Sequence, residues 1–86
     1  MEQIENITSE HVYRAMIKIL IEGVPNGRNY INTAVSYNNH LFPPILLISW
    51  ANLFANGFII EPDANVLNTQ MAVAHLEYLG FTIVNV

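Results

Sequence analysis

The side chains best suited to acid–base or metal chemistry in this chain are three histidines, His11, His40 and His75. Histidine commonly titrates near neutral pH and is the commonest metal ligand. A metal site needs three or four converging ligands. No carboxylate or second histidine stands three or four residues along the chain from any of the three. We therefore expect no metal site, with His75 hydrogen-bonded on a packed face and His40 exposed at the tip of a hairpin.

Catalytic groups are equally sparse. Glu61 and Asp63 lie together in one expected loop, where solvated acids are the simplest interpretation. Ser9, Ser36 and Ser49 stand in no nucleophile-elbow context. The four glycines each end or turn an element, so no phosphate-binding loop is predicted. The absence of cysteine excludes thiol catalysis and disulfides. We expect neither an enzyme nor a cofactor.

The charge pattern points to buried or contacting surface. Hydrophobic residues make up 52% of the 86 residues and charged ones 12%, with a net charge of −4. Residues 29–60 carry no charged side chain, and the cations are only Arg14, Lys18 and Arg28. Nucleic-acid binding usually requires clustered cations. Because disorder needs the opposite composition, the pattern favours either a well-buried small fold or an apolar surface kept for contact.

The length allows one domain, which we place at residues 8–86 behind an N-terminal tail of residues 1–7. The first ten residues, MEQIENITSE, are acidic and unlike a signal peptide. The most apolar window, 41–60, contains Pro43, Pro44 and Gly57, so it predicts two short elements and no membrane span. We expect a cytoplasmic protein with no membrane partner.

Turn and cap signals predict the element order α-β-β-α-α-β. A helix over 9–22 has Thr8 as its N-cap and Gly23 as its stop. Two strands meet in a hairpin turn around 38–40, and a second helix runs from Pro44 to Asn56. A third helix begins near Asn68, and FTIVNV forms a closing strand. The prediction is an α+β fold, winged-helix-like, with three helices packed on a small three-stranded antiparallel sheet.

The first two helices have unusually narrow polar stripes. Val12, Ala15, Met16, Ile19 and Leu20 mark the core face of the first helix. Its polar stripe is Glu10, Arg14, Lys18 and Glu22, and that of the second helix is Ser49, Asn52 and Asn56. One helical layer on one sheet cannot cover both helices on nearly all sides. We therefore expect a partner-binding surface, for a second copy or another protein, formed by Tyr13, Ile17, Ile21, Trp50 and Phe54.

Residues 23–84 resemble the small N-terminal domain of modification-dependent HNH restriction endonucleases. The resemblance rests on turns, helix stops and core positions: Gly23-Val24-Pro25, Arg28, Tyr37-Asn38-Asn39-His40, Phe42-Pro43-Pro44-Ile45, Ala51-Asn52, Ala55-Asn56-Gly57, Val66 to Leu76, Leu79-Gly80-Phe81 and Ile83-Val84. It implies a divergent, stand-alone copy of that domain in a phage-defence or counter-defence system.

The departures from that domain's pattern remove polar and cationic side chains. Asn39-His40 replaces a Gly-Lys pair, Ile45 replaces a lysine, and Ala72-Val73 replaces a Thr-Asn pair, while Asn68-Thr69 replaces a Gly-Gly pair. The leading interpretation is thus a non-enzymatic protein-interaction or oligomerisation domain, with a homodimer as its expected form. The alternative is a small DNA-binding module that uses the 37–42 hairpin and the start of the third helix, through Arg28, Asn38, Asn39, His40, Asn68 and Thr69.

Overall fold

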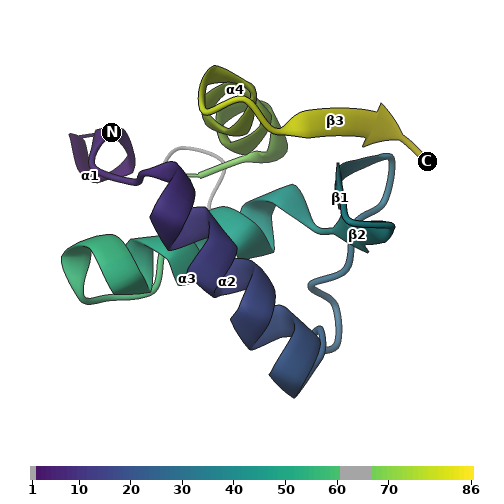
Figure 1. The fold of residues 1–86 in the computed structure, drawn as a ribbon, viewed down its shortest axis with the longest axis horizontal. Helices are drawn as coiled ribbons and strands as arrows, with labels where there is room; N and C mark the ends of the chain where they lie inside the picture. The colour runs from purple at the N-terminus through teal and green to yellow at the C-terminus, as the bar shows by residue number, and fades with distance from the viewer. Residues whose placement is uncertain (1, 61–66) are drawn as a thin grey trace.

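The predicted element order is confirmed, with one additional short helix at the N-terminus (Figure 1). A computed structural model of the chain describes residues 2–60 and 67–86. The elements are α1 (Glu2–Glu5), α2 (Ser9–Glu22), β1 (Thr33–Tyr37), β2 (His40–Phe42), α3 (Pro44–Asn56), α4 (Thr69–Tyr78) and β3 (Thr82–Asn85). The predicted loop acids Glu61 and Asp63, and Val66 of the resemblance, lie outside the described residues.

Helix α2 begins and ends where local chemistry dictates. The backbone N–H of Thr8 donates to Nδ1 of His11 at 3.0 Å, which satisfies a donor at the start of the helix. Ile7 and Val12, on either side of this cap, are both buried as a hydrophobic staple. The helix stops at Gly23, whose φ of 82° favours a residue without a side chain. His11 therefore has a structural role in the cap.

The hairpin turn is the two-residue type that matches strand twist. Asn38 and Asn39 both have positive φ, 50° and 65°, as a type I′ turn requires. Tyr37 pairs with His40 across the turn. The strand order is β2-β1-β3 and both pairings are antiparallel, with Val35 opposite Ile83. The predicted hairpin and three-stranded antiparallel sheet are confirmed.

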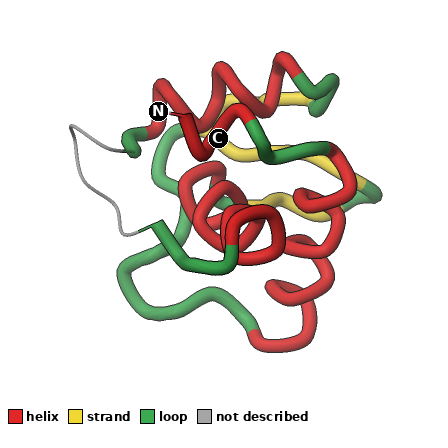
Figure 2. The backbone as a smooth tube through the Cα atoms, turned by 90° about the vertical axis from the view of Figure 1, so that its left-hand side faces the viewer, coloured by secondary structure: helices red, strands yellow, loops and turns green. Residues whose placement is uncertain are grey.

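Helix α3 is the centre of the fold. Pro44 occupies its first turn, and Gly57 ends it in the left-handed conformation. Contacts to α3 come from α1, α2, α4 and β1. Seen nearly end-on in the middle of Figure 2, α3 is surrounded by the other helices. The sheet lies at one end of this helix group, where β1 contacts α3 and β3 contacts α4 (Figure 1).

The expected polar stripe of α3 is wrong, because two of its three side chains face the protein interior and the third, Asn56, is half-buried. Ser49 and Asn52 are fully buried. Oγ of Ser49 donates to the carbonyl of Ile60 at 2.7 Å, and Nδ2 of Asn52 donates to that of Phe58 at 2.8 Å. After Gly57 the chain thus returns along α3, and its backbone acceptors are satisfied by these two side chains. Burial of α3 explains why it carries no charge.

The N-terminal residues expected as a tail are partly core. Ile4 of α1 and Ile7 are buried. Nδ2 of Asn6 donates to Oδ1 of Asn56 at 3.3 Å. Nε2 of His75 lies 2.9 Å from the carbonyl oxygen of Ile7, which confirms the prediction that this histidine is hydrogen-bonded on a packed face. Two apolar residues spaced three apart were too short a pattern to predict this docking.

Replacing Asn52 by alanine should destabilise the fold by about 2–3 kcal/mol, because the Phe58 carbonyl loses its donor and a cavity remains. Urea unfolding followed by circular dichroism measures the change. Asn26→Ala, in an exposed turn, is the matched control and should stay within about 0.5 kcal/mol of the parent. If Asn52→Ala lowered the free energy of unfolding no more than Asn26→Ala does, the buried amide of Asn52 would not contribute to stability.

The hairpin turn predicts opposite effects from two substitutions at Asn39. Asn39→Val should cost about 1–2 kcal/mol, because a β-branched residue is strained at positive φ. Asn39→Gly should stabilise slightly, because glycine is preferred there. The same urea titration measures both, and a tolerated valine would contradict the observed turn.

Candidate docking surface

One face of α2 exposes apolar side chains along the length of the helix. Tyr13, Ile17, Leu20 and Ile21, here called the α2 face, are 41%, 57%, 54% and 78% exposed. Their spacing of three and four residues places them on one side of the helix. The core-facing residues Val12, Ala15, Met16 and Ile19 occupy a neighbouring side. Helix α2 therefore has two apolar faces, and only one of them is covered by the fold.

A groove of about 340 Å³ runs between the α2 face and the hairpin. Tyr13, Met16, Ile17 and Leu20 form one side, and Tyr37, Asn38, His40 and Phe42 form the other. None of these side chains carries a formal charge. The groove can therefore accept an apolar ridge, such as the side chains of another helix.

Three aromatic rings fix the hairpin against α2. The ring centroids of Tyr13 and Tyr37 are 5.4 Å apart, as are those of Tyr13 and Phe81. Tyr37 and Phe81 are separated by 6.4 Å. These distances suit tilted and edge-to-face packing. The cluster joins α2, β1 and the start of β3, so the groove exists before any partner arrives.

Trp50 and Phe54 are on α3 and do not line the groove beside the α2 face. The half-buried ring of Trp50 packs on the core, and Nζ of Lys18 lies 4.5 Å from its centroid. Lys18 projects about 100° around the helix from Ile17. Phe54, one turn further along α3, is 39% exposed. The structure thus separates the five expected partner-binding residues into a group on α2 and a group on α3.

The charged side chains of α2 are all paired within the helix. Arg14 contacts Glu10 at 3.2 Å, and Lys18 contacts Glu22 at 2.7 Å. Each is an i,i+4 pair. The helix is therefore neutral overall, and the Glu10–Arg14 pair borders the α2 face, because each of these residues precedes a residue of that face by three positions.

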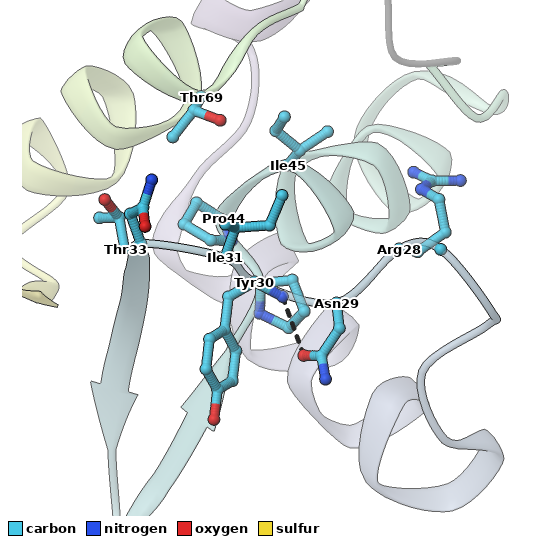
Figure 3. Close-up of a pocket in the computed structure, with 11 residues that line it drawn as sticks. Arg28, Asn29, Tyr30, Ile31, Thr33, Pro44, Ile45 and Thr69 are labelled. Carbon is cyan, nitrogen blue, oxygen red and sulfur yellow. Dashed lines mark hydrogen bonds between the residues drawn. The ribbon is translucent and has the colours of Figure 1, made fainter. Parts of the chain in front are cut away.

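Four of the six expected nucleic-acid residues line one or other of two cavities. Arg28 and Thr69 line a second cavity of about 380 Å³, formed by loop 27–33 and the starts of α3 and α4. In Figure 3, Pro44 and Ile45 lie between Arg28 and Thr69. The ring of Tyr30 points away from these four residues. Asn38 and His40 line the groove beside α2 instead.

Three of the six expected nucleic-acid residues have structural roles. Nη2 of the half-buried Arg28 donates to Oγ of Ser49 at 3.3 Å. Oδ1 of Asn68 accepts from the backbone N–H of Met71 at 2.9 Å and caps α4. Asn39 supplies the second positive φ of the hairpin turn. The six residues therefore do not line one shared cavity.

Within residues 2–60 and 67–86, no three histidine or acidic side chains converge as metal ligands would. None of the helices in this part of the chain has the length and apolar character needed to cross a membrane.

Comparisons with protein-family models, with curated proteins and with solved structures find no match.

Leu20 is the residue of the α2 face that the sequence pattern misassigned. It was expected on the core face, but it is 54% exposed. Leu20 follows Ile17 by three residues and lies beside it, about 80° around the helix from Val12. The three-residue spacing from Ile17 was the signal that could have identified it. When a helix is apolar on two faces, its sequence alone does not indicate which face packs against the core and which remains exposed.

Tyr13 and Ile17, both on the α2 face, should differ in how much each contributes to the free energy of unfolding. Tyr13→Ala removes two ring contacts and should cost about 1–3 kcal/mol. Ile17→Ala removes an exposed side chain and should stay within about 0.5 kcal/mol of the parent. Thermal and urea unfolding at low micromolar concentration measure both. A cost for Ile17→Ala as large as that for Tyr13→Ala would show that Ile17 belongs to the subunit core.

Proposed function

We propose that this chain is a non-enzymatic protein-interaction domain, which binds a second copy or another protein through the α2 face. The observation that carries the proposal is the row of four large apolar side chains exposed on α2 beside an uncharged groove. Aromatic and large apolar side chains without charge are typical of the central part of protein interfaces. Contiguous exposed apolar surface marks such sites in folded subunits.

Incomplete folding does not account for this exposure. The accessible surface of the chain is 5129 Å². A compact monomer of this mass, 9.7 kDa, is expected to expose about 5,100 Å². The subunit therefore buries as much surface as chains of its size ordinarily do. The apolar side chains of α2 remain outside a fold that is already closed.

The setting of this interaction is also part of the proposal. The resemblance to the leading domain of modification-dependent restriction endonucleases supports a component of a phage-defence or counter-defence system. Asn38-Asn39, Pro44 and Gly57, three points on which the resemblance rests, form the hairpin turn, the start of α3 and its end. The side chains of the α2 face lie outside residues 23–84, so the resemblance says nothing of the docking surface itself.

Photo-cross-linking in cells of the natural host tests the proposal. A benzophenone amino acid at position 17 should give adducts of defined mass, because Ile17 lies at the middle of the α2 face. The same group at Tyr78, which is 82% exposed on α4, is the matched control and should give none.

Adding Ile21→Glu should abolish the adduct at position 17 without unfolding the chain, because Ile21 is 78% exposed. Circular dichroism of the purified variant verifies the fold. Absence of any adduct, or equal adducts from positions 17 and 78, would overturn the proposal.

A further inference from the structure

We infer that the junction between α1 and α2 is a pH-sensitive switch, in which two histidines hold the peptide unit between Ile7 and Thr8 and protonation of His11 alone releases it. This inference does not depend on the proposed function. It follows from the two hydrogen bonds of one peptide unit and from the charge state that each histidine ring needs in order to make its bond.

Both polar groups of this peptide unit are bonded to histidine. The carbonyl oxygen of Ile7 lies 2.9 Å from Nε2 of His75 on α4, and the N–H of Thr8 donates to Nδ1 of His11 at 3.0 Å. The peptide bond is trans, so its carbonyl and its N–H point in opposite directions. The two rings therefore hold the chain from opposite sides where α1 meets α2.

These bonds determine which ring nitrogen carries a proton. A carbonyl oxygen only accepts, so Nε2 of His75 must donate, and both the neutral and the charged ring can do this. A backbone N–H only donates, so Nδ1 of His11 must be free of a proton, which requires the neutral ring. The hydroxyl of Thr8, 3.2 Å from the same Nδ1, can reverse its role, but the backbone N–H cannot. Protonation therefore breaks the bond to His11 and preserves the bond to His75.

The positions of the two rings on their helices act in the same sense. His11 is the third residue of the first turn of α2, where the helix dipole disfavours a positive charge. His75 is in the last turn of α4, where the dipole favours one. Oγ of Ser9, in the same turn as His11, donates to the carbonyl of Leu79 at 3.4 Å. Acid should thus loosen the start of α2 while the carbonyl of Ile7 stays bound to α4.

The other titratable groups on the elements packed here do not replace either bond. Helix α3 and strand β3, which contact these helices, have no titratable side chain. The four charged residues of α2 pair with one another, and the ring of Tyr78 stacks on that of His75 with centroids 5.9 Å apart. Among the described side chains of the three helices, the set is Glu5 on α1, Glu10, Arg14, Lys18 and Glu22 on α2, and Glu77 and Tyr78 on α4.

Glutamine, which does not titrate, tests each position. His11→Gln keeps an acceptor for the N–H of Thr8, as glutamine does in a capping box. His75→Gln keeps an N–H donor for the carbonyl of Ile7. His40→Gln, at the exposed end of the hairpin, is the matched control. Urea unfolding at pH 7.5 and pH 5.5, on either side of the usual range of histidine, gives the unfolding constant of each chain.

The stability that His11 provides is present while its ring is neutral and is lost as the pH falls. Between pH 7.5 and pH 5.5 the unfolding constant of the parent should therefore rise about three- to fivefold relative to that of His11→Gln, the usual effect of one helix cap. Relative to His40→Gln it should not change. Relative to His75→Gln it should stay level or fall, because a charged donor bonds more strongly.

The same pH dependence in the parent and in His11→Gln would overturn the inference. A second measurement does not require the variants to fold. Nitrogen NMR of the histidine rings in the parent at pH 7.5 should show Nδ1 of His11 without a proton and Nε2 of His75 with one. A proton on Nδ1 of His11 in the folded chain at that pH would also overturn it.

Discussion

The burial of α3 is the constraint on which the rest of this structure depends. A helix contacted by α1, α2, α4 and β1 cannot carry a charge without a compensating partner, and α3 carries none. Its two buried polar side chains, Ser49 and Asn52, are tolerated because each donates to a backbone carbonyl of the returning chain. Because α3 fills the interior of so small a fold, each surrounding helix needs only one side to cover it.

The exposed side of α2 follows from this arrangement. Val12, Ala15, Met16 and Ile19 are sufficient to cover α3. Charged side chains on the remaining surface would have cost the subunit nothing, yet the charges are confined to two ion pairs and the α2 face is apolar. Folding does not require this composition, since the subunit already has the accessible surface of a compact monomer. The association proposed for α2 would give this composition a reason.

Features set by neighbouring residues could be predicted from the sequence. Thr8 and Gly23 bound α2, Asn38-Asn39 form the turn, and Gly57 ends α3, because each depends on backbone conformation within a few residues. Features set by contacts between distant parts of the chain could not be predicted from the sequence. The polar spacing of Ser49 and Asn52 is the same whether they face solvent or the carbonyls of residues 58–60. The exposure of Tyr13, Ile17 and Ile21 agrees with their expected place on the surface, but only the fold shows that Nζ of Lys18 lies over the ring of Trp50.

The side chains that line the two cavities differ in the contacts they allow. Ile45 lines the cavity beside loop 27–33, and His40 lines the groove beside α2. No lysine, arginine or acidic side chain lines that groove, and the ring cluster of Tyr13, Tyr37 and Phe81 holds the hairpin against the helix. A hairpin fixed in this way can act as the wall of a groove. A groove without lysine or arginine offers a phosphate no cation to pair with, and it lowers the desolvation cost of an apolar ligand.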